Sequence, residues 1–415
     1  MSHGTGVVIT GLGVVAPLGT GREAFVRALL SGRCGLSAVR AFPTRGQPSR
    51  LGGEIADFSL EALLCLDPYP LRYVDRLTEL ALAATFLALK DAGGLERMPE
   101  RGRIGLAVGI GHGTNAVNAA YHRGILEEGP PGASPLLFPF TTASAVAGVL
   151  SIVFGIQGTH LTASAGEASD LLALQEGVRW LREGTADAAV VAASATFDRT
   201  VYAALAALGV LSPGPRGGEE GCWPLDARHN GTVLSEGAAA LVLERDRDAR
   251  ARGARIHGEV LAVTSGYWRD RACSGGGRGL EQSMRQALRR GGISPEAVAW
   301  VCAAANGRPG LDRREARTIQ AVLGPEVPVS APRAALGESF GASTLMGLVG
   351  AVAATQAGSV PPTAGFEKAA SGARIRVAAR AEAAPGDLVL VNGTSSHGHH
   401  GSILLKVERK HGGEA

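Results

Sequence analysis

The feature that most limits the possible folds is a regular alternation of short apolar segments with longer alanine-rich segments. Val7–Val15, Ile104–Ile110 and Ala188–Ala193 are continuous apolar runs of strand length. Leu77–Ala92 and Gly166–Arg182 have helical length and stand between such runs. Strands that are apolar on both faces and alternate with helices are typical of a sheet covered by helices on both sides. The sequence therefore predicts an α/β fold.

The second half of the chain repeats this scheme. His257–Thr264 and Val298–Ala304 are predicted strands, and Gly279–Gly291 is a predicted helix between them. Ala186–Ser194 resembles Gly386–Thr394, and each follows a short strand and a small-residue helix. Two similar halves indicate one duplicated α/β body rather than two unrelated domains.

We therefore predict an N-terminal half over residues 1–250 and a C-terminal half over residues 251–415. Within the first half, residues 111–141 are rich in Gly and Pro and show little periodicity. Such a segment is predicted to be an excursion over the body or toward a partner.

Composition excludes several classes of protein. The 415 residues are 45% hydrophobic and 19% charged, enough to bury a large core, so disorder is not expected. The 41 basic and 38 acidic residues are scattered and give a net charge of +3. No basic block is interleaved with aromatic residues, so a nucleic-acid partner is not expected.

The cysteines and the apolar runs predict a reduced, cytoplasmic protein. The chain has no CxxC pair, which argues against a zinc site or a disulfide framework. No basic segment followed by a long apolar region opens the chain, and no apolar run approaches the roughly 18 residues of a membrane helix. A signal peptide, a membrane span and a membrane partner are therefore not expected. The five cysteines are Cys34, Cys65, Cys222, Cys273 and Cys302.

Two motifs resemble a known family. Val8–Gly19, with the sequence VITGLGVVAPLG, resembles the opening of β-ketoacyl-carrier-protein synthases. Pro224–Asp226, followed by Asn230–Gly231 and Ser235–Ala238, resembles a later motif of the same family. The resemblance runs over nearly the whole chain. It implies the thiolase fold, with two βαβαβαββ halves in a five-layer αβαβα core, working as a dimer.

The chemistry of that family requires a Cys at the N-terminus of a buried helix and two His residues, supported by a Lys. Aligning the motifs places Ser164 where the Cys is expected, within Thr162–Gly166. Ala304 stands where the first His is expected, and Arg333 replaces the Lys. Glu338 occupies the position of the second His. All four positions are therefore degenerate, and no catalytic residue is assigned.

These replacements remove the expected chemistry. Ala304 has neither a proton to donate nor a lone pair to accept one. Ser164 is a poor nucleophile without a base, because its hydroxyl stays protonated at neutral pH. A carboxylate at Glu338 would repel a malonyl group, where an imidazole would donate a hydrogen bond.

Because the Cys and both His residues are lost together, the chain resembles the chain-length factor, or ketosynthase β subunit, of bacterial type II polyketide synthases. The resemblance implies a heterodimer with a catalytic ketosynthase, an acyl carrier protein that delivers the polyketide acyl chain, and no cofactor. The alternative is a stand-alone acyl transferase or a malonyl-carrier-protein decarboxylase that uses Ser164.

In that family an acyl tunnel crosses the subunit interface, and its volume sets the chain length by steric exclusion. The interface segments that match are Gly113–Ala120, Phe138–Thr142 and Ser194–Tyr202. For the aromatic residues among them, a place in the core is as well supported as a place in the tunnel wall. The candidate tunnel and interface residues are Gly113, Ala116, Phe138, Phe140, Phe197 and Tyr202.

Simpler structural roles are also predicted for three features. Ser164 would be a small residue that packs at a helix start and caps it. Glu338 would be a structural carboxylate paired with Arg333. His397, His399 and His400 alternate with Gly and have no distant Cys or carboxylate partner in sequence, so no metal site is expected there.

Overall fold

The computed structural model describes residues 6–56, 58–64, 74–214, 219–268, 277–372 and 374–409. Two of the five cysteines, Cys65 and Cys273, lie outside the described residues. Cys34, Cys222 and Cys302 are free thiols, and the last two are buried. No helix in the described ranges is long and apolar enough to cross a membrane.

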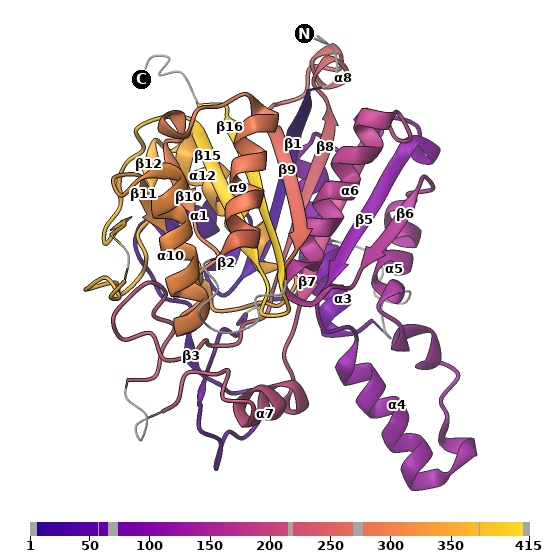
Figure 1. Cartoon of the computed structure of the whole chain (residues 1–415). Helices are drawn as coiled ribbons and strands as arrows, with labels where there is room; N and C mark the ends of the chain where they lie inside the picture. Colours follow the sequence, from indigo (N-terminus) through magenta and orange to yellow (C-terminus); the bar gives the residue numbers. More distant parts are fainter. Residues whose placement is uncertain are drawn as a thin grey trace.

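One mixed sheet runs through the described part of the chain (Figure 1). Its strand order is β13-β11-β10-β15-β16-β9-β1-β8-β7-β5-β6, and β2 pairs with β1. The strands of this sheet are β1 (Val7–Ala16), β2 (Gly19–Thr20), β5 (Ile104–Ile110), β6 (His160–Ala163), β7 (Ala188–Ala195), β8 (Gly237–Arg245), β9 (Gly258–Tyr267), β10 (Trp300–Cys302), β11 (Pro328–Ser330), β13 (Arg376–Val377), β15 (Leu388–Thr394) and β16 (His399–Val407). The short strands β3 (Ser37–Ala38), β4 (Leu51–Gly52), β12 (Ser359–Val360) and β14 (Glu382–Ala383) form two small pairs, β3 with β4 and β12 with β14.

The two halves of the sheet meet where β1 pairs with β9. This pairing is short and antiparallel, with Val8 opposite Glu259 and Ile9 opposite Gly258. On the N-terminal side, β5 is parallel to β6 and β7, while β8 is antiparallel to β7 and β1. On the C-terminal side, β10 is parallel to β11 and β15, and β16 is antiparallel to β15 and β9. The strands of both halves join in one sheet, so the sheet does not divide the chain into two units at residue 250. That boundary stays a prediction.

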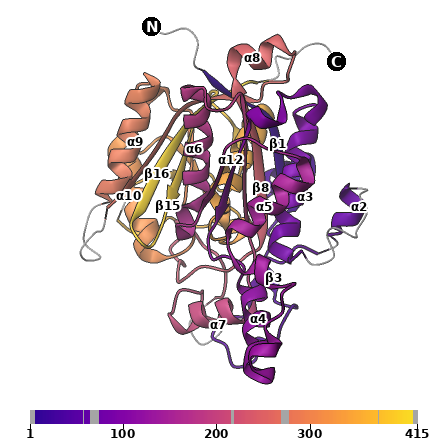
Figure 2. The same cartoon turned by 90° about the vertical axis from the view of Figure 1, so that its right-hand side faces the viewer.

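The helices complete five layers (Figures 1 and 2). On the N-terminal side, α3 packs on β1 and β8, and α5 packs on β5 and β6. On the C-terminal side, α9 packs on β9 and β16, with α10 beside it. Helices α6 and α12 lie between the two halves of the sheet, because α6 contacts β5 and β9 while α12 contacts β8 and β15. The α-helices are α1 (Arg22–Leu30), α2 (Leu60–Leu64), α3 (Arg76–Asp91), α4 (Asn115–Glu128), α5 (Ser144–Phe154), α6 (Ser169–Glu183), α7 (Arg199–Ala207), α8 (Asp246–Ala251), α9 (Arg278–Gly291), α10 (Pro309–Leu323), α11 (Arg333–Leu336) and α12 (Ser343–Gln356).

The sequence explains why α12 takes a central position. The helix has no charged residue, and every residue from Ser343 to Thr355 is buried. A helix that is apolar all round is stable only when it is covered on all sides. On the opposite face of the sheet, two glycines of β1 allow the helix α3 to lie close to the strand. A Cβ on Gly11 or Gly13 would overlap the backbone oxygen of Ala88 or Ala84 in α3.

The excursion predicted at residues 111–141 contains a helix that the sequence did not indicate. The helix α4 projects from the body in both views and buries only Val117 (Figures 1 and 2). Its weak periodicity follows from that exposure, because a helix with no covered face needs no apolar stripe. Short 3₁₀ turns follow it at Pro130–Gly132 and Phe138–Thr141. The strand β8 and the helix α7 were also not predicted.

Candidate functional site

The structure brings Ala304, Arg333 and Glu338 together. Ala304 lies just beyond the end of β10, Arg333 begins α11, and Glu338 follows the end of that helix. The guanidinium of Arg333 donates a hydrogen bond from Nη1 to the backbone oxygen of Ala304. Its Nε lies 3.4 Å from Oε2 of Glu338. The predicted Arg333–Glu338 ion pair is therefore present, and both side chains are buried.

Both oxygens of the Glu338 carboxylate are occupied. Asn306 donates from Nδ2 to Oε2 at 2.8 Å, and the hydroxyl of Ser343 donates to Oε1 at 2.7 Å. Burial alone would lower the pKa of Arg333, but Glu338, Asp170 and other nearby acids raise it above its usual value. The guanidinium therefore stays charged, and the pair is a fixed structural unit rather than a free acid or base.

Two more buried acids hold the loop that carries Ala304. Glu315, on α10, accepts hydrogen bonds from the backbone N–H of Ala304 at 2.8 Å and from Asn392 at 3.0 Å. Burial raises the pKa of Glu315, and these hydrogen bonds oppose that rise. Asp312 accepts from the backbone N–H of Asn306 at 3.0 Å and from that of Leu225 at 2.9 Å. These hydrogen bonds hold the backbone around Ala304 in place, although the Ala304 side chain can neither donate nor accept a proton.

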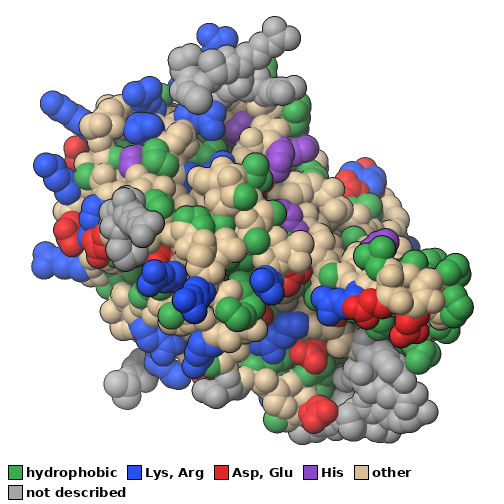
Figure 3. Space-filling model, turned by 90° about the horizontal axis from the view of Figure 1, so that it is seen from below, with side chains coloured by type: hydrophobic (Ala, Val, Ile, Leu, Met, Phe, Trp, Pro, Cys, Tyr) green, Lys and Arg blue, Asp and Glu red, His purple; other side chains and the backbone are tan. Residues whose placement is uncertain are grey.

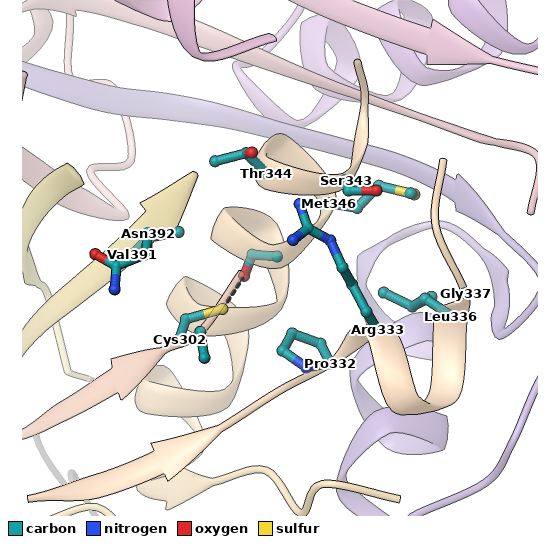
Figure 4. A pocket seen from close by; sticks show the side chains of 12 residues that line it. Cys302, Pro332, Arg333, Leu336, Gly337, Ser343, Thr344, Met346, Val391 and Asn392 are labelled. Carbon is teal, nitrogen blue, oxygen red and sulfur yellow. Dashed lines mark hydrogen bonds between the residues drawn. The ribbon is translucent and has the colours of Figure 1, made fainter. Parts of the chain in front are cut away.

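The interior beside Arg333 is nearly full (Figure 4). The remaining space is about 10 Å³, which is room for one water molecule. In Figure 4 the Arg333 side chain extends from α11 toward Ser343 and Met346 of α12. The other lining residues are Cys302, Ala303, Pro332, Leu336, Gly337, Thr344, Gly347, Val391 and Asn392.

Ser164 lies outside this cluster. It is exposed in the turn after β6, and neither the 3₁₀ turn Gly166–Ala168 nor α6 has a side-chain cap. The prediction of a packed capping serine is therefore wrong. The reason is the position of the helix start: the N-cap positions are Ala165 and Ala168, so the Ser164 hydroxyl stands one residue too early.

The residue that occupies the buried start of this helical segment is Glu167, which sequence reasoning missed. Only 2% of Glu167 is exposed. Its carboxylate accepts hydrogen bonds from the hydroxyls of Ser395 and Ser396 at 2.7 and 2.6 Å. His397 Nδ1 lies at 3.3 Å and Arg308 Nη1 at 3.8 Å. An acidic residue at the start of a predicted helix was the available signal, because such an acid is favoured there by the helix dipole.

Electrostatics link Glu167 to Glu338. Burial raises the pKa of the Glu167 carboxyl, but the hydrogen bonds from Ser396 and Ser395 outweigh it and hold that pKa below its usual value. Burial lowers the pKa of His112, and Glu167 and Glu338 both oppose that shift. The charges of both carboxylates therefore act on the imidazole of His112. The site as a whole holds two buried carboxylates, one paired with Arg333 and the other near Arg308.

The candidate tunnel residues fall into two separate groups. Gly113 lies in the turn before α4 and Ala116 in its first turn, while Phe138 is 61% exposed and its ring centroid lies 6.0 Å from that of Tyr121. Phe140 is half-buried in the following 3₁₀ turn.

Phe197 and Tyr202 form the second group with Phe42. The Phe197 ring lies 6.1 Å from that of Tyr202, and Phe42 lies 5.9 and 5.5 Å from the two. Tyr202 is buried and donates its hydroxyl to the backbone oxygen of Leu51 at 3.0 Å. Tyr202 is thus a core residue of this chain.

The histidine cluster is divided among different contacts. His397 faces Glu167, and the ring of His399 lies 5.1 Å from that of Tyr267. In the described part of the chain, no group of three or more His, Cys, Asp or Glu side chains is placed to hold a metal ion.

Comparison with known proteins agrees with this architecture. The description "Beta-ketoacyl synthase, N-terminal domain" matches residues 5–249, and "Beta-ketoacyl synthase, C-terminal domain" matches residues 260–367. The chain is 32% identical to the tetracenomycin polyketide synthase ketoacyl synthase beta subunit of Streptomyces glaucescens, over 90% of this chain and 91% of that protein. It is 30% identical to 3-oxoacyl-[acyl-carrier-protein] synthase 2 of Synechocystis sp., over 87% and 88%.

Solved structures give the same result. The ishigamide ketosynthase/chain length factor superposes with a TM-score of 0.88 at 26% identity, over 98% of this chain and 100% of that chain. The predicted thiolase-like α/β fold is confirmed. From the family match, the relatives and the shared fold together, the chain belongs to the beta-ketoacyl synthase family.

Proposed function

We propose that this chain is a chain-length factor, the non-condensing partner of a catalytic ketosynthase in a type II polyketide synthase. The heterodimer would extend acyl chains delivered by an acyl carrier protein, and the interface tunnel would limit their length. The observation that carries this proposal is the buried Arg333–Glu338 pair, whose guanidinium also donates to the backbone oxygen of Ala304.

The charge of the site supports the proposal. Decarboxylative condensation needs groups that stabilise a developing enolate, and an ionised carboxylate does the opposite. Glu167 and Glu338 are both buried, and their oxygens are engaged by protein donors. Replacing one of these residues alone would leave the other charged groups in place. We therefore infer that Glu167 and Glu338 have a structural role in a subunit of a heterodimer and do not take part in catalysis in this chain.

An apolar surface suited to a partner supports it as well. β6 is an end strand of the described sheet order, so its outer edge is open to pairing. On the adjacent helix α5, which has no charged residue, Ile152 is 83% exposed. Leu136 and Phe138 are 55% and 61% exposed on the neighbouring excursion. Exposed apolar side chains of this size next to an open strand edge are typical of a protein interface.

The excursion adds a projecting arm to this surface. Figure 3 shows a lobe on the right that carries hydrophobic side chains along its outer edge. On α4, Leu126 is 85% exposed. An arm with little covered surface of its own gains most of its stability by packing against a second subunit. The names of relatives with this fold, a ketosynthase/chain length factor and a ketoacyl synthase beta subunit, support the same assignment.

Co-expression with an intact ketosynthase tests the proposal. We expect a one-to-one complex in size exclusion with light scattering, and chain extension only when both subunits are present. A ketosynthase that is fully active alone while this chain stays homodimeric would exclude a chain-length factor.

The alternative, an acyl transferase that uses Ser164, has its own test. The purified chain is incubated with acylated carrier protein, and intact mass is measured on wild type and S164A. We expect no acyl adduct on either. An adduct on the wild type that is lost in S164A would establish the alternative.

A further inference from the structure

A cavity of about 660 Å³ lies in the outer helical layer of the N-terminal half. Its walls come from α2, α3, α5 and the 3₁₀ turn Leu95–Arg97. Helix α3 contacts both α2 and α5, and Figure 2 shows these three helices on the same side of the body. Small-molecule sites typically have volumes of about 300 to 1,000 Å³, so this cavity has the size of a ligand site. None of the described residues that line it belongs to the candidate site.

The walls of the cavity are mostly apolar. The apolar residues that line it are Leu64, Phe86, Leu89, Leu95, Val153 and Phe154. Half of them are buried in the core beneath the cavity, and the other half pack against that core but remain half-buried. A ligand that covers the half-buried side chains removes apolar surface from water, which contributes about 25 cal/mol per Å². The cavity is therefore suited to a ligand with an apolar body.

Two glycines keep one edge of the cavity free of side chains. Gly93 and Gly94 follow α3 with φ angles of 96° and 90°, and both line the cavity. Residues with a Cβ are disfavoured at such positive φ angles, so the turn after α3 requires glycine at these positions. The chain thus leaves α3 with backbone, and no side chain, at this edge of the cavity.

The charged side chains that line the cavity are Lys90, Glu96 and Arg97, and all three are exposed. The Glu96 carboxylate lies against Gly94. The Arg97 side chain passes close to Gly93, because a Cβ on that glycine would lie 3.6 Å from Cδ of Arg97. Within the described residues, Lys90 and Arg97 form no ion pair. Both cations are therefore available to a ligand at the exposed side of the cavity.

We propose that this cavity binds an amphipathic anion, an aliphatic chain that ends in a carboxylate. The chain lies against the apolar walls, and the head group lies near Lys90 and Arg97. Apolar walls with a few polar groups that fix the orientation of the ligand are the usual composition of a small-molecule site. Because the cations outnumber the single acid, an anionic head group is favoured over a cationic one. Such a ligand is separate from the proposed function, since it needs neither a ketosynthase nor the residues around Ala304.

Isothermal titration of the full chain with decanoate, below its critical micelle concentration, tests the proposal. In V153W a larger side chain fills the space that the aliphatic chain occupies, so we expect decanoate to bind at least tenfold more weakly than to wild type. I152W is the matched control. It adds a Trp at the preceding residue of α5, which is 83% exposed and does not line the cavity. We expect the affinity of I152W for decanoate to stay near that of wild type.

A second pair of variants tests the charge. K90Q/R97Q removes both cations that line the cavity, and K368Q/R374Q removes an exposed Lys and an exposed Arg elsewhere. We expect K90Q/R97Q to bind decanoate about fivefold more weakly, with the control near wild type. Both variants should bind 1-decanol as wild type does, because that probe carries no charge. These substitutions change only exposed side chains, so they test the site even if V153W does not fold.

Three outcomes would overturn the proposal. They are the absence of decanoate binding by wild type, equal affinity of V153W and I152W, and equal affinity of K90Q/R97Q and K368Q/R374Q. Decyltrimethylammonium has the same chain with the opposite charge, and we expect it to bind at least fivefold more weakly than decanoate. Equal affinity for the two probes would contradict an anionic head group. Circular dichroism of each variant shows whether it is folded. No ketosynthase enters these measurements, so failure of this site is distinguishable from failure of the proposed function.

Discussion

Nε of Arg333 lies 3.4 Å from Oε2 of Glu338, and both side chains are buried. The pair stands at the two positions where the resemblance to ketosynthases implies a Lys and a His. A buried ion pair loses much of its attraction to desolvation, but removing one partner leaves the other charge uncompensated. The pair is therefore difficult to dismantle by single substitutions.

Unfolding free energies of R333M, E338M and R333M/E338M test this coupling. Each single variant should lose about 3 kcal/mol or more, because it buries an unpaired charge. The double variant should lose clearly less than the sum of the two, since neither residue is left facing the charge of its partner. Urea unfolding measures all three. Losses that simply add up would show that the two charges act independently.

A cysteine placed at position 167 should titrate at a lower pH than one placed at position 164. Glu167 is at the buried start of the helical segment next to His397 and Arg308, whereas Ser164 is exposed in the preceding turn. A helix N-terminus and nearby cations lower a thiol pKa from its ordinary value of about 8.5. Alkylation of E167C and S164C by iodoacetamide is followed against pH. If S164C titrates at the lower pH, Ser164 rather than Glu167 occupies the activating position.

I152D should lower the affinity of this chain for a ketosynthase at least tenfold while leaving the free subunit folded. Ile152 is 83% exposed, so a charge there costs the monomer little, within about 0.5 kcal/mol. In an interface the same carboxylate would be buried without a partner. A297D, at an exposed position on the 3₁₀ turn Pro295–Ala297, is the control. Analytical ultracentrifugation of the mixture gives the affinity, and unchanged pairing by I152D would remove α5 from the interface.

F140A should lengthen the product of the assembled synthase. Phe140 is half-buried on the excursion, and truncating it would remove a bulky obstacle from the proposed tunnel. Y202F is the contrasting variant, because Tyr202 is a core residue whose hydroxyl bonds to Leu51. It should lose about 1 kcal/mol of stability and leave the product unchanged. The measurement is the mass of the product made by the reconstituted synthase. An unchanged product chain length in F140A would show that Phe140 does not line the tunnel.

Asp187 should contribute to stability only above its folded-state pKa. The hydrogen bond from Arg103, together with that from Arg245, lowers the pKa of Asp187 from 3.8 to about 2. A lowered pKa stabilises the folded state above the unfolded value and stops doing so as pH falls through the folded value. The Tm difference between wild type and D187N should therefore be largest above about pH 4 and vanish well below pH 2. A difference that persists well below pH 2 would mean that Asp187 acts through something other than its charge.

The sequence alone determined the arrangement of elements around the site. The apolar runs at Val7–Val15 and Ile104–Ile110 form β1 and β5 because a strand buried on both faces must be apolar throughout. The positions of Ala304, Arg333 and Glu338 were predicted from the resemblance to β-ketoacyl-carrier-protein synthases, and the expected ion pair between the last two is present. The strands depend on residues adjacent in the chain, so local pattern is sufficient to find them.

The tertiary structure decided what local pattern leaves open. It shows that Ser164 is exposed in the turn before the helical segment, whereas Glu167 at the start of that segment is buried. The hydroxyl that holds Glu167 belongs to Ser395, 228 residues away in sequence. No window of sequence contains both groups, and an acid at a helix start is ordinarily a solvated one. The identity of the site therefore depended on which distant loops the sheet brings together, whereas the alternation of apolar and alanine-rich segments was sufficient to predict the α/β class of the fold.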